Sequence, residues 1–263
     1  MASATHSTAP LPPLVRAADY AGASSSAART LVEGQLRYMH YSCDGFCDNG
    51  WGCGLRTVQT ILSWLNPDLP PPSIPEMQAI LGHAAGSTSW IGVQEAVVLL
   101  DELYDATVEV LPLSSGRELK SNLPRLATHL ASGGGPLMIG GTTDVYSKTI
   151  IGVDQERSAL LILDPHYVGG AVHARDVESL RAAGWAAWKP LFAALNDGSC
   201  YNVALPRRPP QPAAGGPKMK PPRAVNSAVA DARPGNRPEV PAPDNGKASW
   251  EFEFEVVEEG CEG

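Results

Sequence analysis

The residues most able to do chemistry lie between His40 and Thr57, a segment that holds three of the five cysteines. Within it, Cys53 stands between Gly52 and Gly54 and directly precedes a helical apolar pattern. A thiol at a helix N-terminus meets the positive end of the helix dipole and unpaired N–H groups, and both favour the thiolate. The glycines let the backbone turn sharply and let a substrate approach closely. Cys53 is therefore the candidate nucleophile.

A cysteine nucleophile needs a base, and the base needs a group that orients it. Among six histidines, His166 stands out because it follows the apolar segment Leu160–Leu163 and lies two residues after Asp164. If the strand continues through Pro165, both side chains point to the same face, where the carboxylate can stabilise the imidazolium. On spacing alone, an ordinary surface histidine after a strand is an equally good interpretation.

The cysteines have two alternative roles, as metal ligands or as inert core thiols. Cys43, Cys47 and Cys53 are separated by three and five residues, with His40 nearby. Zinc sites typically use tighter pairs and a second Cys or His pair, so we predict no metal. Cys53 as an inert core thiol is the remaining alternative, although flanking glycines fit a packed core poorly.

Composition narrows the class of protein. The chain of 263 residues carries a net charge of −8 and lacks a long basic stripe, so no nucleic-acid partner is expected. It has no run of 18 apolar residues, so no membrane span is expected. Residues 1–30 lack a secretory h-region and are expected to form a flexible arm, and a cytoplasmic location with reduced thiols follows. Their acid-poor, Ser-rich composition leaves an organelle-transit segment open as an alternative.

Apolar periodicity divides the rest of the chain. Helices come first and strands later, which favours an α+β fold with a central antiparallel sheet in residues 31–206. A Pro-rich stretch without aromatic residues, 207–248, is predicted to be a disordered linker before a tail at 249–263. Helices are predicted at 54–65, 73–81, 93–103, 119–130 and 176–183. Strands are predicted at 107–111, 136–140, 148–153, 160–163, 185–188 and 201–205.

The tail has a period of two. Trp250, Phe252, Phe254 and Val256 alternate with glutamates, which places the apolar side chains on one face of a strand. Such a segment can add to the edge of a ubiquitin-like fold. Phe254 to Val257 also has the spacing of motifs that bind autophagy-related ubiquitin-like proteins. A strand docked on its own domain, or a disordered tail, is the alternative.

The segment HYSCDGFCDNGWGCGLRTVQ, residues 40–59, resembles the active-site segment of the ubiquitin-fold modifier 1-specific cysteine proteases. The resemblance covers roughly residues 31–206 in order, and the short N-terminal arm resembles the shorter form of that family. The further matching motifs are Ser89–Gly92, Pro136–Gly141, Lys148–Val153, Asp164–Tyr167 and Gly184–Lys189.

The resemblance implies a papain-like fold in which Cys53 is the nucleophile, His166 the base and Asp164 its orienting acid. It also implies that Tyr41 helps to form the oxyanion hole, although the sequence alone favours a core tyrosine. Trp51 would line a narrow channel for glycine residues, with core packing as the equal alternative.

The implied reaction is maturation of the ubiquitin-fold modifier 1 precursor and cleavage of its isopeptide bonds after the C-terminal glycine. No cofactor is implied. The modifier and its conjugates are the expected partners of a monomer, with recruitment to the endoplasmic reticulum surface as an option.

The sequence departs from the family at two places. Cys47 replaces an expected polar or acidic residue and could form a disulfide with Cys53. Residues 140–146 also differ from the expected pattern. An autophagy-type protease shares the Gly-Trp-Gly-Cys and Asp-Pro-His segments, and a non-catalytic modifier-binding adaptor is the alternative from another class.

Overall fold

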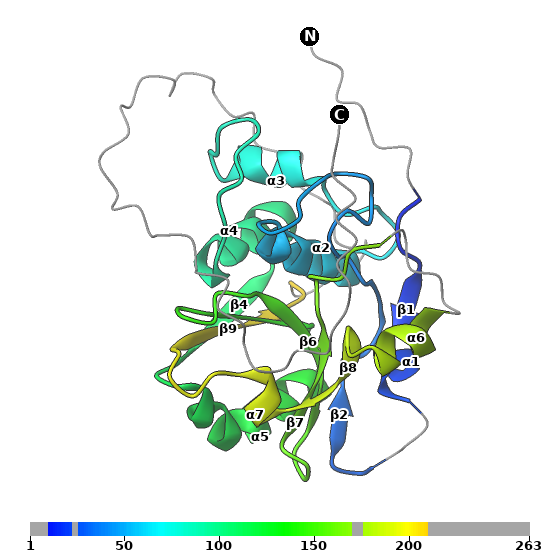
Figure 1. Cartoon of the computed structure of the whole chain (residues 1–263), viewed down its shortest axis with the longest axis vertical. Coiled ribbons are helices and arrows are strands. Elements are labelled where there is room, and N and C mark those ends of the chain that lie inside the picture. The colour runs from blue at the N-terminus through cyan, green and yellow to red at the C-terminus, as the bar shows by residue number, and fades with distance from the viewer. Residues whose placement is uncertain (1–9, 23–25, 170–175, 210–263) are drawn as a thin grey trace. The chain divides into compact units, whose positions relative to one another are not determined.

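A seven-stranded sheet is the centre of the computed structural model, which describes residues 10–22, 26–169 and 176–209 (Figure 1). The strand order is β4-β9-β5-β6-β7-β8, and β2 also pairs with β6. Every pair is antiparallel. The strands are β2 Arg29–Leu31, β4 Thr107–Leu113, β5 Leu137–Gly141, β6 Lys148–Asp154, β7 Ala159–Leu163, β8 Ala186–Pro190 and β9 Tyr201–Arg207.

The middle of this sheet is covered on both faces. All of β7 is buried, as is all of β6 after Lys148. Since successive side chains of a strand point to opposite faces, a fully buried strand must have neighbours on both. Helices α2 and α5 both pack against β6. The α+β fold with a central antiparallel sheet, predicted from the element order, is confirmed.

The predicted helices form where the apolar periodicity placed them. All thirteen residues of α2 are buried, which makes it the central helix. Ser73 caps α3 reciprocally with Glu76, as the spacing predicted. The helices are α1 Ala17–Ala21, α2 Cys53–Leu65, α3 Ile74–Ile80, α4 Val93–Tyr104, α5 Leu119–Ala131, α6 Val177–Ala182 and α7 Leu191–Ala194, with a 3-10 turn η1 at Gly116–Glu118. In the part of the chain described, no helix has the length and apolar character needed to cross a membrane.

The prediction of a flexible arm over residues 1–30 is wrong for the described part of that segment. Strand β1, Leu14–Arg16, pairs with β3, Gln35–Arg37, and α1 follows β1 directly. Strand β2 joins the central sheet, and Arg29 forms an ion pair of 3.0 Å with Asp154 at the end of β6. Strands of three residues are too short to show an apolar period, so the prediction rested on composition alone and was misled by it.

The chain beyond residue 209 lies outside the described residues. The tail residues Trp250, Phe252, Phe254 and Val257 and the predicted linker from residue 210 onward fall there, whereas the first residue of that predicted linker, Arg207, belongs to β9. Strand β9 extends to Arg207, two residues past the predicted end of that strand.

Candidate active site

Cys53 is the first residue of α2, as the sequence predicted. Its thiol is free and buried, with 3% of the residue exposed. The next residue has to be small, because a Cβ atom on Gly54 would lie 2.6 Å from the backbone oxygen of Ile91. Gly54 therefore lets the first turn of the helix pack closely beside Cys53.

Asp164 and His166 meet, but not along a strand. Strand β7 ends at Leu163, and His166 lies in the turn that follows. Asp164 Oδ1 accepts hydrogen bonds from the His166 backbone N–H at 3.2 Å and from Nδ1 at 2.6 Å. The bond to the backbone is that of an Asx-turn, in which an aspartate side chain accepts from the N–H of the second residue after it. The pairing was predicted correctly, and the predicted strand geometry was wrong.

Other groups hold Asp164 in place. The Asp164 backbone N–H donates to the Trp185 carbonyl at 2.8 Å, and the Tyr38 hydroxyl donates to the Asp164 backbone carbonyl. Lys189 Nζ lies 3.6 Å from Asp164 Oδ2. The sequence assigned no role to Lys189 or Tyr38. Lys189 ends one of the motifs shared with the protease family, whereas nothing in the sequence marks Tyr38.

The thiol and the imidazole shift each other's ionisation. Burial alone would raise the pKa of Cys53, but the hydrogen bond and charge of His166 outweigh it, aided by Ser147 and Tyr41, so that this pKa is lowered. Burial would likewise lower the pKa of His166, but hydrogen bonds to Asp164 and Cys53 raise it to about 9. The site therefore favours a thiolate beside an imidazolium, the reactive form of a cysteine nucleophile.

The geometry of this contact is loose. Among the described residues, the buried Nε2 of His166 has no hydrogen-bond partner of regular geometry, although the Cys53 sulfur acts on the imidazole. Catalytic hydrogen bonds in free enzymes are often long or poorly aligned and tighten when substrate binds.

Asp164 ionises readily despite its burial. Burial opposes ionisation of this carboxyl, but the hydrogen bond and charge of His166 dominate and lower its pKa to about 2. Asp164 is thus a carboxylate at neutral pH and can hold the Nδ1–H tautomer of His166.

Tyr41 lies beside both Cys53 and His166. Its backbone N–H donates to the Pro165 carbonyl at 2.9 Å, and it forms a parallel bridge with Val168. Its ring packs edge-on against the imidazole, with ring centres 5.3 Å apart. Burial and the nearby Cys53 raise the pKa of Tyr41, whose hydroxyl hydrogen-bonds the Cys53 side chain. The hydroxyl therefore stays protonated and available as a donor.

His40 also contributes to the site. Its Nδ1 lies 3.0 Å from the Tyr41 carbonyl and 3.2 Å from the Tyr167 carbonyl. Both partners only accept, so Nδ1 must carry the proton. Burial lowers the pKa of His40 to about 4, so the ring is neutral at neutral pH. From the sequence, His40 was singled out only as a neighbour of a candidate metal site. In the structure it joins the backbone at Tyr41 to the backbone at Tyr167, the residue after His166.

The connection between β5 and β6 supplies an aromatic residue that the sequence did not identify. The Tyr146 ring packs edge-on against His166, with ring centres 4.8 Å apart, and its centre is 6.4 Å from that of Trp90. Tyr146 and Trp90 remain 46% and 40% exposed. Tyr146 ends the segment that departs from the family pattern, and Trp90 belongs to a shared motif. These signals marked the segments and left the roles open.

Trp51 and Cys47 were also singled out from the sequence. Trp51 is partly buried against the core, and its ring packs edge-on against Phe46 with centres 6.0 Å apart. Its role in a substrate channel stays a prediction. The anticipated Cys47–Cys53 disulfide is not formed, because Cys53 carries a free thiol.

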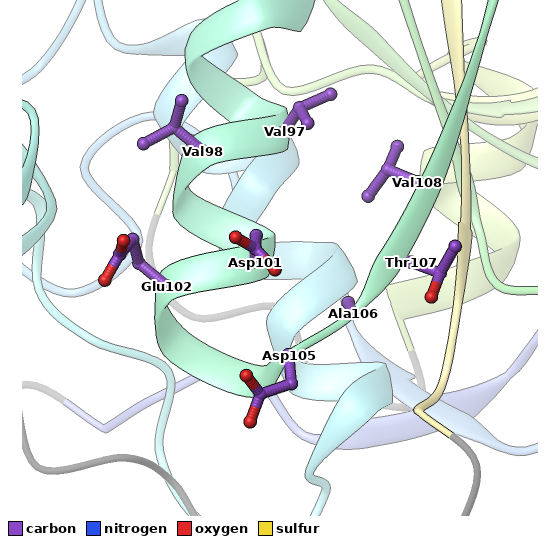
Figure 2. Close-up of a pocket in the computed structure, with 8 residues that line it drawn as sticks. All are labelled: Val97, Val98, Asp101, Glu102, Asp105, Ala106, Thr107 and Val108. Atoms are coloured by element: carbon purple, nitrogen blue, oxygen red, sulfur yellow. The ribbon is translucent and has the colours of Figure 1, made fainter.

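A surface pocket of about 440 Å³ lies elsewhere, between α4 and the start of β4 (Figure 2). None of the predicted catalytic residues lines it. Its lining combines apolar and acidic side chains and consists of Val97, Val98, Asp101, Glu102, Asp105, Ala106, Thr107 and Val108.

Known proteins resemble the chain over this same region. The mouse (Mus musculus) Ufm1-specific protease 1 is 36% identical over 188 residues, which cover 67% of this chain and 85% of the mouse protein. The human (Homo sapiens) Ufm1-specific protease 2 is 40% identical over 195 residues, covering 68% of this chain and 40% of the human protein. A probable Ufm1-specific protease of rice (Oryza sativa subsp. japonica) is 38% identical, and the match covers 30% of it.

A solved structure agrees with these relatives. The crystal structure of UfSP from C. elegans superposes with a TM-score of 0.61 at 37% sequence identity, covering 70% of this chain and 35% of that one. This supports the papain-like form of the α+β fold. Residues 27–204 match peptidase family C78. The chain therefore belongs to peptidase family C78 and is a cysteine protease related to the Ufm1-specific proteases.

Proposed function

We propose that this protein matures the precursor of ubiquitin-fold modifier 1 and releases the modifier from conjugated proteins, by cleaving after its C-terminal glycine. The observation that carries the proposal is the arrangement of three groups. Cys53 begins α2, the His166 imidazole interacts with its sulfur, and Asp164 holds that imidazole at 2.6 Å. The relatives named as Ufm1-specific supply the choice of modifier.

The first half of the reaction forms a thioester. The Cys53 thiolate attacks the carbonyl carbon of the glycine, and negative charge develops on the carbonyl oxygen. The Tyr41 hydroxyl and the Cys53 backbone N–H donate to that oxygen, and one such donor is typically worth about 3 kcal/mol of barrier. The His166 imidazolium then protonates the departing amine, and Asp164 keeps the ring oriented.

The second half releases the modifier. His166, now neutral, accepts a proton from water as the water attacks the thioester carbonyl. Collapse of this second tetrahedral intermediate expels the Cys53 thiolate, which takes up its charge beside the imidazolium again. The modifier leaves with a free C-terminal carboxylate. The chain's own residues supply every proton transfer in this sequence, without a cofactor.

A panel of modifiers carrying a C-terminal electrophile tests this proposal. Ubiquitin-fold modifier 1, ubiquitin and an autophagy-related ubiquitin-like protein are each offered to the wild type and to Cys53→Ser. We expect the probe made from ubiquitin-fold modifier 1 to label the wild type covalently and the other two probes not to. We expect no probe to label Cys53→Ser. Labelling by the autophagy-related probe instead would assign the protein to the other class of protease. Binding without labelling would support an adaptor.

The tail is a separate part of the proposal. Trp250, Phe252, Phe254 and Val257 would capture a ubiquitin-like protein by adding a strand to its sheet. Removal of residues 249–263 should then leave hydrolysis of a small substrate unchanged and weaken capture of the modifier. Equal capture by the full and the shortened chain would discard this role.

The family resemblance is also the ground for proposing a location in the cytoplasm, with recruitment to the endoplasmic reticulum surface.

A further inference from the structure

The first turn of α2 buries a charged residue three positions after Cys53. Arg56 is fully buried, so its charge and its donors need partners inside the protein. Nε and Nη2 donate to the Asp48 carboxylate at 2.9 and 2.8 Å. Nη1 and Nη2 donate to the Asp44 carboxylate, both at 2.8 Å. One guanidinium thus makes two paired contacts with carboxylates, which fix its plane and its position. We call Arg56, Asp44 and Asp48 the Arg56 cluster.

The Arg56 cluster connects both ends of the loop between Tyr41 and Cys53. Asp48 Oδ1 also accepts the backbone N–H of Ser42, the residue after Tyr41, at 2.9 Å. The Asp48 carbonyl accepts the N–H of Gly52, the residue before Cys53, at 2.9 Å. Asp48 therefore contacts a direct neighbour of each of the two groups that lie beside the reacting carbonyl in the proposed mechanism.

The Asp48 side chain of the cluster packs tightly against the backbone at Gly52. A Cβ atom on Gly52 would lie 2.6 Å from the Cβ atom of Asp48, so the Asp48 side chain fills the space that any larger residue would need. Burial alone would raise the pKa of Asp44, but its hydrogen bond to Arg56 and the nearby charge lower it. The Arg56 cluster is therefore ionic as well as tightly packed.

We propose that Arg56 is a positioning residue, which keeps the Tyr41 hydroxyl aligned with the Cys53 sulfur by holding Asp48 and Asp44 against α2. It would touch neither the substrate nor the reacting atoms. The inference rests on the active site proposed above. A loss of this alignment would weaken stabilisation of the oxyanion, while the thiolate, which His166 chiefly maintains, would largely remain.

A double-mutant cycle separates positioning from simple stabilisation of the fold. Asp44→Asn, Tyr41→Phe and the combined variant are compared by kcat and KM on a fluorogenic modifier substrate. Tyr41→Phe should lower kcat about 100-fold, in the range for loss of one oxyanion donor. Asp44→Asn should lower kcat about 10-fold with KM nearly unchanged, and the combined variant should match Tyr41→Phe alone, because coupled residues are not additive. A combined loss equal to the product of the two would overturn the inference.

Alkylation of Cys53 as a function of pH supplies the second readout. Asp44→Asn should keep the thiol pKa low, because His166 contributes most to lowering it, with only a small rise from the weakened Tyr41 hydrogen bond. A profile displaced to that of an ordinary thiol would mean that the whole site has collapsed and would count against positioning. Arg56→Lys keeps the charge but cannot form two paired contacts, so it should reproduce the fall in kcat. If Asp44→Asn does not fold, Arg56→Lys takes its place in the cycle.

Arg29→Lys is the matched control. Arg29 forms a largely buried ion pair with Asp154, at the end of β6. The other end of that strand lies next to the active site, because Ser147, which bonds to Cys53, precedes its first residue. This control should lower thermal stability and leave kcat within about twofold, as expected for a distant site. If Tyr41→Phe keeps full activity while Cys53→Ser is inactive, the positioning inference fails and the protease assignment stands. If Cys53→Ser keeps activity, the proposed active site itself fails.

Discussion

Two loops contact Cys53 and His166, and they are built differently. The loop from Tyr41 to Gly52 is tied to α2 by the buried Arg56 cluster. The connection from β5 to β6 is anchored at its start, where the N–H groups of Thr143 and Asp144 donate to Ser199 Oγ at 3.0 and 3.2 Å.

The second connection becomes more open towards its end, since Tyr146 is nearly half exposed beside His166. The loop beside Tyr41 and Cys53 is thus held from within the protein, whereas Tyr146 in the other connection faces solvent beside His166. This matches the general need of catalytic sites for rigid support behind the reacting groups.

The largest effect is expected at Asp164, which lies in neither loop but orients the His166 imidazole that both loops contact. Asp164→Asn should lower kcat by about 10³- to 10⁴-fold, because an amide neither fixes the tautomer nor stabilises the imidazolium. The His166 pKa should also fall, since Asp164 is the first of the groups that raise it. Steady-state kinetics measures the first effect and the alkaline limb of the pH profile the second. A fall below tenfold would contradict the role of Asp164.

A steric change tests whether the rigid side tolerates movement. Gly52→Ala places a methyl group against the Asp48 side chain, 2.6 Å from its Cβ atom. We expect about a 100-fold loss of kcat, of the size of one oxyanion donor, and about 1–3 kcal/mol lower free energy of unfolding from overpacking. Gly198→Ala, whose nearest described neighbour is a side-chain oxygen at 3.4 Å, is the control and should behave like the wild type. Equal activity of both variants would show that the loop is softer than described.

The pH dependence sharpens the comparison because each loop places an aromatic ring against His166, whose charge changes with pH. The pKa of His166 is raised from 6.5 to about 9. Its contribution to stability is therefore fully present below pH 6.5 and is lost as pH rises through 9. Activity should decline above pH 9, about tenfold per unit, as the imidazolium that protonates the leaving group is lost. A profile that is flat to pH 10.5 would argue against the thiolate–imidazolium pair.

The smallest effect is expected on the exposed side. Tyr146→Ala should raise KM by about two- to tenfold, as expected when a single exposed aromatic contact is removed. It should change the free energy of unfolding by less than about 0.5 kcal/mol, as most surface changes do. Initial-rate kinetics and thermal unfolding measure the two quantities. A 100-fold loss of kcat at unchanged KM would place Tyr146 among the positioning residues and remove the contrast between the loops.

The sequence predicted long, periodic elements well and short or distant relations poorly. The apolar spacing of 54–65 marked α2 and placed Cys53 at its start. Asp164 and His166 were paired correctly, but the backbone between them turns instead of extending.

Lys189 and Tyr146 reach the site through the pairing of β5, β6, β7 and β8 and its register, which no local pattern encodes. Strand β2 contains three residues, and its partner lies more than a hundred residues further along the chain. Local periodicity cannot reveal a pairing of that kind.

Strand β2 also determines how far the protein can be trimmed. Arg29, Thr30 and Leu31 cover the outer backbone groups of the last part of β6, and the Val32 N–H donates to the Ile151 carbonyl. A version that begins after these residues would expose an apolar strand edge, which is a template for self-association. Preparations of such a shortened protein should therefore aggregate even though every proposed catalytic residue is still present.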